Sequence, residues 1–113
     1  MAQIRSYLET YAHIRFQRIA NHKTFDNTFF GERAGFVESR TEADGILEDV
    51  YYIFPEYFKN TIAKGIPLKA VTKLLVDLGI MESGSNKDRA TALPYINGKR
   101  QRMYVINSRI FEA

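Results

Sequence analysis

The residue types of this 113-residue chain that could do chemistry gather near its C-terminal end, where arginines and lysines alternate with tyrosines. Guanidinium and ammonium groups bind phosphates, and tyrosine rings stack on bases or sugars, so this mixture is typical of a surface that binds nucleic acid. A single acidic residue, Asp88, lies among them, which favours this interpretation over the alternative that the arginines only solubilise an edge strand. The candidate nucleic-acid-binding residues of this segment are Lys87, Arg89, Tyr95, Lys99, Arg100, Arg102 and Tyr104.

Charge is distributed unevenly along the chain. Residues 1–58 carry 6 basic and 9 acidic side chains, whereas residues 59–113 carry 10 basic and 4 acidic ones, so the two halves have net charges of −3 and +6. The net charge of the whole chain, +3, conceals this difference. A chain of this kind can present a basic face to an anionic partner, although charges also segregate by chance in short sequences.

The dipeptide Asn97-Gly98 predicts how the two basic segments pair. Asn-Gly favours a two-residue type I′ turn, because both central residues of that turn need a positive φ. In this register Tyr95 opposes Arg100. Tyr104 falls on the same face, although it can instead be an ordinary core aromatic. Alternation of side chains predicts a binding face with Thr91, Leu93, Tyr95, Arg100, Arg102 and Tyr104, and a core face with Ala90, Ala92, Ile96, Met103 and Val105.

Two consecutive helices are predicted before this hairpin. Pro55 suits the first turn of a helix over residues 56–64, which ends at Gly65. A second helix over residues 68–78 ends at Gly79. Two helices joined by a turn that contains glycine are typical of a helix-turn-helix.

The second of these helices carries the other candidate contact surface. In a helix-turn-helix, the exposed side of the second helix lies in the major groove, so we expect Lys69, Thr72 and Lys73 to contact DNA. Taken alone, two lysines one turn apart also fit a solvated surface. Apolar residues at helical spacing predict the buried side, which comprises Leu68, Val71, Leu74, Leu75 and Leu78.

The N-terminal half predicts the remaining elements. Residues 2–12 have the apolar spacing of a helix, and residues 14–19 fit either its continuation or an extended segment. Segments 33–38 and 49–54 favour strands that a turn at 43–45 could join into a hairpin. We therefore predict a single α+β domain over residues 1–113. It is winged-helix-like, with a helix-turn-helix followed by a β-hairpin wing and an additional N-terminal helix and β-hairpin.

Several kinds of chemistry need residues that the chain lacks. It has no cysteine and no glycine-rich phosphate-binding motif, and His13 and His22 lack the spacing of a metal site or a catalytic triad. We therefore expect no catalysis, no cofactor and no metal. One acidic cluster could hold a divalent ion, but it matches no calcium-loop motif and suits a solvated turn; it comprises Glu42, Asp44, Glu48 and Asp49.

The sequence predicts no membrane partner. Its apolar runs are too short for a membrane-spanning helix. The first residues lack the apolar segment of a secretory signal, which predicts a cytoplasmic address.

Short blocks spread over nearly the whole chain carry a family resemblance; they are residues 7–9, 15–17, 33–36, 52–58, 64–65, 78–81 and 98–106. In this order they resemble the C-terminal region of a domain-of-unknown-function family of phages, plasmids and integrative elements. Its members are described as helicase- or primase-like, with an ATPase core upstream. The resemblance implies a tail domain of a mobile-element replication protein, or a stand-alone relative, in which Arg15, Arg33 and Arg102 match the family pattern. The ATPase motifs are absent here, so no ATPase activity is implied, and Ala12 stands where we expect a glycine at the end of the first helix.

These patterns predict a non-catalytic DNA-binding accessory domain of a mobile-element replication protein. Its expected partners are double- or single-stranded DNA and an upstream helicase- or primase-like ATPase core. The alternative is a protein-interaction or oligomerisation module, and a less favoured one is a phage inhibitor of a host nucleic-acid enzyme. Aromatic residues of the N-terminal half could supply the surface of an interaction module, namely Phe25, Phe29, Phe30, Tyr51 and Tyr52.

Overall fold

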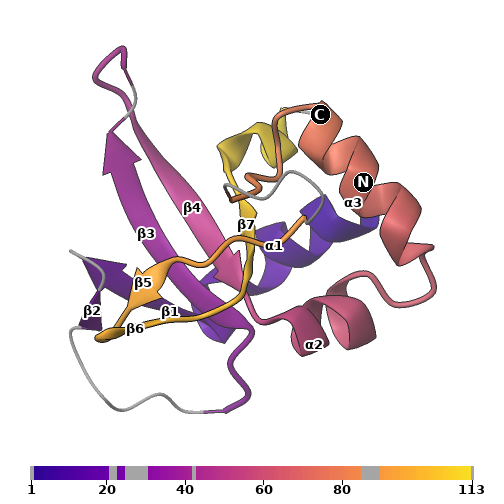
Figure 1. The fold of residues 1–113 in the computed structure, drawn as a ribbon, viewed down its shortest axis with the longest axis horizontal. Helices are drawn as coiled ribbons and strands as arrows, with labels where there is room; N and C mark the ends of the chain where they lie inside the picture. Colours follow the sequence, from indigo (N-terminus) through magenta and orange to yellow (C-terminus); the bar gives the residue numbers. More distant parts are fainter. Residues whose placement is uncertain (1, 21–22, 25–30, 42, 85–89, 113) are drawn as a thin grey trace.

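The computed structural model describes residues 2–20, 23–24, 31–41, 43–84 and 90–112 (Figure 1). Its helices are α1 (Ala2–Arg15), α2 (Pro55–Tyr57), the π-helical η1 (Phe58–Ile62), α3 (Leu68–Asp77) and the 3-10 helix η2 (Ser108–Phe111). Its strands are β1 (Phe16–Ala20), β2 (Lys23–Thr24), β3 (Gly35–Thr41), β4 (Leu47–Ile53), β5 (Tyr95–Ile96), β6 (Lys99–Arg100) and β7 (Tyr104–Ile106).

Five of these strands form one mixed sheet in the order β2-β1-β3-β4-β7, while β5 and β6 form a separate hairpin. β1 runs parallel to β3, and the other neighbouring pairs are antiparallel. The predicted α+β class is confirmed. The sequence pattern left residues 14–19 open between helix and strand; the structure continues α1 through Ala12 to Arg15 and then begins β1.

β3 and β4 form the predicted hairpin, with Gly35 opposite Ile53 at one end and Thr41 opposite Leu47 at the other. Gly35 is required by close packing rather than by a special φ. A Cβ built on it would lie 1.7 Å from the carbonyl oxygen of Tyr52, so any larger residue would push the two strands apart.

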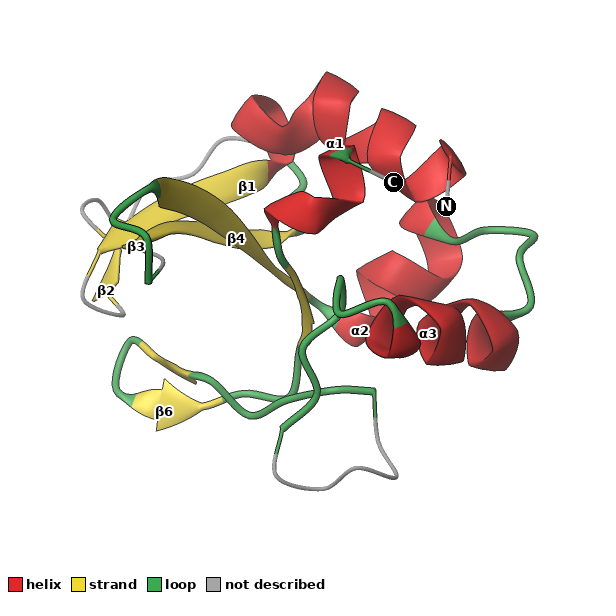
Figure 2. Cartoon of the chain, turned by 90° about the horizontal axis from the view of Figure 1, so that it is seen from above, coloured by secondary structure: helices red, strands yellow, loops and turns green. Residues whose placement is uncertain are grey.

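Both faces of the sheet are covered, which separates the core into two clusters. On one face, α1 and the helices after β4 bury Ile4, Leu8, Phe58 and Leu75 against the sheet. On the other face, a smaller cluster joins the sheet to the hairpin, with Ile19, Phe36, Ile96 and Met103 fully buried or nearly so. Figure 2 shows the β5–β6 hairpin on the side of the sheet away from α1.

The two predicted helices after β4 are present. The first begins at Pro55, as predicted, but it continues as a π-helical turn in which the Ala63 amide donates to the Phe58 carbonyl at 2.7 Å. Gly65 and Gly79 follow the two helices with φ of 81° and 74°, in the left-handed region that favours glycine.

The predicted buried side of α3 is only partly correct. Val71 and Leu75 are buried, but Leu74 and Leu78 remain 46% and 47% exposed, and Thr72 is buried in their place. The buried side of α3 is therefore the side that carries Val71, Thr72 and Leu75, rather than the side that carries Leu74 and Leu78.

Candidate functional site

The β5–β6 hairpin has the predicted register. Tyr95 pairs with Arg100 and Ile96 pairs with Lys99. Asn97 and Gly98 form the turn with φ of 52° and 86°, the positive values that a type I′ turn needs. The pairing continues away from the tip through an isolated bridge between Ala92 and Met103; the predicted alternation of faces is therefore correct along this hairpin.

The inner face of the hairpin fixes it to the sheet. Ile96 and Met103 are fully buried and belong to the cluster that contains Ile19 and Phe36. Burying two large apolar side chains gives the hairpin a defined position, which a two-stranded ribbon would not keep alone. The opposite face is thereby held toward solvent, where Tyr95 is 52% exposed.

The arginines of this outer face form no ion pair with a carboxylate within the described part of the chain. The Arg100 guanidinium donates to the Leu93 carbonyl at 3.3 Å, and the Arg102 guanidinium donates to the Thr91 hydroxyl at 2.9 Å. Both arginines and Lys99 are exposed. These neutral acceptors orient the arginines while leaving their positive charge uncompensated, so an anion can bind there.

Tyr104 does not belong to this outer face, and its prediction as a binding residue is wrong. It is buried, and its ring centre lies 4.6 Å from that of Phe58. Burial also raises the pKa of Tyr104. The alternation was assigned correctly, but beyond the hairpin the chain enters β7, where helices cover the face that is solvated near the tip.

On α3, Lys69 and Lys73 are exposed as predicted, but the prediction for Thr72 is wrong. Thr72 is only 7% exposed, and its hydroxyl donates to the Leu68 carbonyl at 2.9 Å, so it cannot offer a contact to DNA. In both views α3 and the tip of the β5–β6 hairpin lie at opposite sides of the molecule (Figures 1 and 2). The structure does not bring the two predicted contact sets into one surface.

Some of the remaining predicted residues lie among the described residues, and others lie outside them. Tyr51 is buried, with its ring centre 5.3 Å from that of Phe16, so its prediction as part of a partner surface is wrong; Tyr52 is half-buried. Arg33, one of the arginines of the family pattern, lies over the Phe36 ring at 4.7 Å. Six predicted residues lie outside the described residues: Phe25, Phe29, Phe30, Glu42, Lys87 and Arg89.

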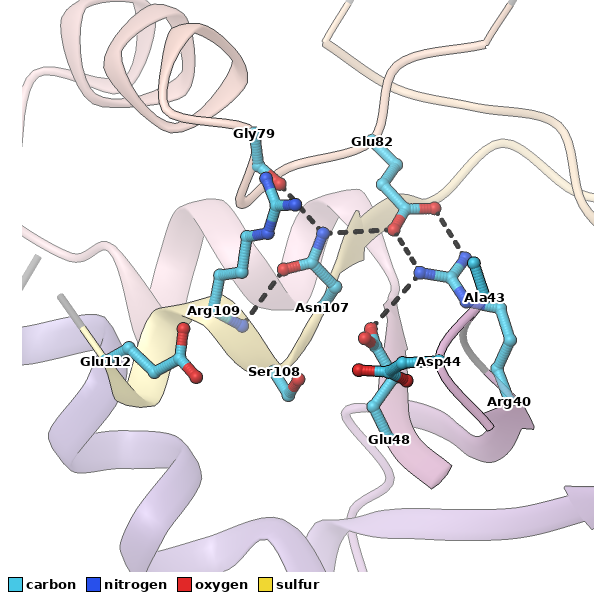
Figure 3. Close-up of a pocket in the computed structure, with 10 residues that line it drawn as sticks. All are labelled: Arg40, Ala43, Asp44, Glu48, Gly79, Glu82, Asn107, Ser108, Arg109 and Glu112. Atoms are coloured by element: carbon cyan, nitrogen blue, oxygen red, sulfur yellow. Dashed lines mark hydrogen bonds and ion pairs between the residues drawn. The ribbon is translucent and has the colours of Figure 1, made fainter. Parts of the chain in front are cut away.

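A pocket of about 550 Å³ contains a charged network that the sequence analysis missed (Figure 3). Arg40 of β3 donates to both carboxylate oxygens of Glu82, at 2.8 and 2.6 Å, and also contacts Glu48 at 3.2 Å. The Asn107 amide donates to Glu82 at 3.0 Å and to the Gly79 carbonyl at 2.8 Å. No sequence spacing could reveal these contacts, because Arg40 and Glu82 lie 42 residues apart.

This network ties the end of α3 to β3 and β7. The hydrogen bond from Arg40 is the main cause that lowers the pKa of Glu82, with a further contribution from Asn107. Glu82 and Glu48 of this pocket are therefore held by Arg40, and Glu82 also by the Asn107 amide. Among the described residues no group of three histidines or carboxylates could hold a metal ion.

A second pocket of about 380 Å³ lies beside the hairpin. Arg100, Leu93 and Pro94 line it from the hairpin side, and Glu82 and Ser83 line it from the segment after α3. Sequence reasoning missed this pocket because its two walls come from segments that no local pattern places together.

No protein-family model matches the chain, and comparisons with curated proteins and with solved structures found no match either. The family resemblance of the sequence blocks therefore stays a prediction. Over the described residues, no helix has both the length and the apolar character needed to cross a membrane.

Proposed function

We propose that this chain is a non-catalytic DNA-binding domain whose contact surface is the outer face of the β5–β6 hairpin. One observation carries the proposal: Arg100 and Arg102, with Lys99 at the tip, are exposed beside an exposed Tyr95 and form no ion pair with a carboxylate among the described residues. Cations placed beside an exposed aromatic ring suit a ligand that offers phosphates and flat bases.

The mechanism is phosphate binding by a ribbon of fixed geometry. Arg100 and Arg102 lie two residues apart on one face, a spacing of about 6.6 Å along a strand, so they can contact successive phosphates. Ile96 and Met103 hold that face in place, which reduces the ordering cost of binding. Tyr95, opposite Arg100, supplies the stacking surface.

We also propose that the C-terminal half is winged-helix-like. The order of the elements supports this proposal: β4 is followed by α2 and η1, then by the turn at Gly65, then by α3, and the hairpin comes after α3. In addition, β4 pairs with β7. In this arrangement the β5–β6 hairpin is the wing. Exposed Lys69 and Lys73 on α3 would form a separate, weaker contact, since α3 lies away from the hairpin tip (Figure 1).

From the resemblance of the sequence blocks, we also propose that this domain accompanies a helicase- or primase-like ATPase core of a mobile element, in the cytoplasm. In that setting the domain would hold DNA for the core without contributing a reacting group. The absence of ATPase motifs in this sequence agrees with this division of labour.

Fluorescence anisotropy with labelled DNA over a series of salt concentrations tests the proposal. Each phosphate contact lowers log K by about 0.9 per log unit of salt on duplex DNA, so the three hairpin cations predict a slope of about −3. The absence of binding to both single-stranded and duplex DNA at low salt would overturn the proposal.

A second candidate function, a protein-interaction module, is favoured by one observation on α3. Leu74 and Leu78, one helical turn apart, are 46% and 47% exposed. Two leucines on one side of a helix, flanked by Lys73, suit a helix-in-groove contact. Light scattering after size exclusion, with Leu74→Glu as the comparison, tests it. A mass that exceeds one chain and falls in the variant would support self-association over a monomeric DNA binder.

A further inference from the structure

The pocket of about 380 Å³ beside the hairpin connects directly to the proposed DNA surface. Arg100 belongs to both, because it lines the pocket and also lies across from Tyr95 on the outer face. Leu93, two residues before Tyr95, lines the pocket and is 45% exposed. A ligand bound along the outer face therefore reaches the pocket without leaving the hairpin.

The walls of the pocket combine apolar surface with a few polar groups. Tyr52, Leu93 and Pro94 supply the apolar part. Tyr52 is fixed in place, because its hydroxyl donates to Glu38 at 3.2 Å, and burial raises the pKa of Tyr52 to about 12, so it stays neutral. Apolar surface beside polar groups that can hydrogen-bond suits a flat heterocycle with polar edges better than a hydrated ion.

The acidic group in the pocket does not oppose an anionic strand. Glu82 lines the pocket, but both of its oxygens accept hydrogen bonds from Arg40, at 2.8 and 2.6 Å. Its charge is thereby compensated by the Arg40 guanidinium. Arg100 remains the cation of this pocket, and within the described part of the chain its guanidinium donates to a carbonyl oxygen and to no carboxylate.

We propose that this pocket accepts one unpaired base and that the domain binds single-stranded DNA in preference to duplex DNA. The base enters between Tyr52, Leu93 and Pro94, its phosphate lies on Arg100, and a neighbouring base stacks on Tyr95. Bases inside a duplex are paired and stacked on both faces, so a duplex cannot supply this group without being opened. The inference rests on the proposed function and specifies its substrate class.

The first test compares three fluorescein-labelled probes of about 12 nucleotides, a length within the site sizes of single-strand binders. They are a single strand of mixed sequence, the blunt duplex of the same sequence, and a strand of the same length that lacks bases. We expect the single strand to bind at least about fivefold more tightly than either other probe, the effect of losing one stacked base.

The second test uses variants at exposed or half-buried positions of the site. Tyr95→Ala should weaken single-strand binding about fivefold or more while leaving duplex binding within about twofold, because stacking is lost but charge is kept. Ser83→Phe should fill the pocket and remove the preference for the strand with bases. Ser83→Ala and Tyr11→Ala are the matched controls, since Ser83→Ala leaves the pocket open and Tyr11 is an exposed tyrosine of α1. Circular dichroism shows whether each variant folds.

The outcomes separate the two proposals. Equal affinity for the single strand and the duplex, or unchanged binding by a folded Ser83→Phe variant, overturns the single-strand inference and leaves DNA binding intact. A lack of binding to all three probes at low salt overturns the proposed function as well.

Discussion

Two sets of arginines in this molecule have opposite surroundings. In the central sheet, Arg18 pairs with Asp49 at 3.2 Å, and Arg40 pairs with Glu48 and Glu82. In the hairpin, among the described residues, Arg100 donates to the Leu93 carbonyl and Arg102 to the Thr91 hydroxyl, and neither pairs with a carboxylate. Arginines of the first kind hold strands and loops together, whereas arginines of the second kind keep their charge available for an anion.

The difference between paired and unpaired arginines arises from the side chains on the strands near them. Glu48 of β4 lies opposite Arg40 of the neighbouring β3, and Asp49 of β4 contacts Arg18 of β1 across β3, so ion pairs form on the sheet. The strand opposite Arg100 and Arg102 carries no acidic residue from Ala90 to Ile96. Arginines on strands can therefore either hold the fold together or remain available to bind an anion. The side chains on the neighbouring strands determine which of these roles they have.

The largest effect is expected where the hairpin is attached to the sheet. Ile96→Ala removes a fully buried side chain and should lower the free energy of unfolding by about 2–5 kcal/mol, from lost burial and the cavity left behind. Urea denaturation measures it. Leu93→Ala, on the exposed face of the same strand, is the control and should cost far less. Similar losses in both variants would mean that the inner face does not anchor the hairpin.

Charge reversal tests the unpaired arginines directly. The double variant Arg100→Glu, Arg102→Glu should lose DNA affinity on the order of 100-fold at low salt, because two phosphate contacts become repulsive. Anisotropy titration measures the affinity. The control, Lys59→Glu with Lys64→Glu, changes the net charge equally at two exposed positions, one in η1 and one in the turn after it. Equal losses in the two double variants would point to a general effect of net charge instead of a site.

The paired arginines should behave in the opposite way. Arg40→Ala removes the partner of Glu82 and should lower the free energy of unfolding by about 1 kcal/mol, a modest value because the pair is partly exposed. DNA affinity should stay within about twofold. Urea denaturation and anisotropy on the same sample check both values, and a loss of affinity without a loss of stability would contradict the assigned role.

The smallest effect is a pH dependence at Glu82. Its pKa in the folded state lies below the ordinary value of 4.5, mainly because Arg40 donates to it. The stability that this carboxylate contributes is present above that ordinary value and is lost as pH falls through the folded pKa. The difference in unfolding free energy between the wild type and Glu82→Gln should therefore shrink as the pH is lowered from about 7 to about 3. A constant difference would show that Glu82 contributes no charge-dependent stability.

Local signals predicted the elements of this fold more reliably than the surfaces. Asn97-Gly98 predicted the hairpin register correctly, and Pro55 and Gly79 marked the beginning of one helix and the end of another. These signals work because they depend on φ preferences and the missing amide of proline, which are properties of single residues. The parallel pairing of β1 with β3 had no such signal, since it joins segments separated by a long connection.

The candidate site was likewise predictable only where it depends on local sequence patterns. Tyr95, Arg100 and Arg102 are predicted from residue type and alternation, and Lys99 from its position at the tip of the hairpin; the structure leaves all four exposed. The arginine network of Figure 3 and the pocket beside the hairpin were not predictable, because their members come from distant segments of the chain.

The sequence by itself determined which residues of the hairpin share a face, because side chains alternate along any strand. Only the tertiary structure decided which faces meet solvent. Tyr104 follows the same alternation as Tyr95, yet helices bury it while Tyr95 stays exposed. Thr72 was likewise placed on a polar side of α3 and is buried by packing. Periodicity depends on the local backbone, whereas burial depends on what the rest of the chain packs against each face.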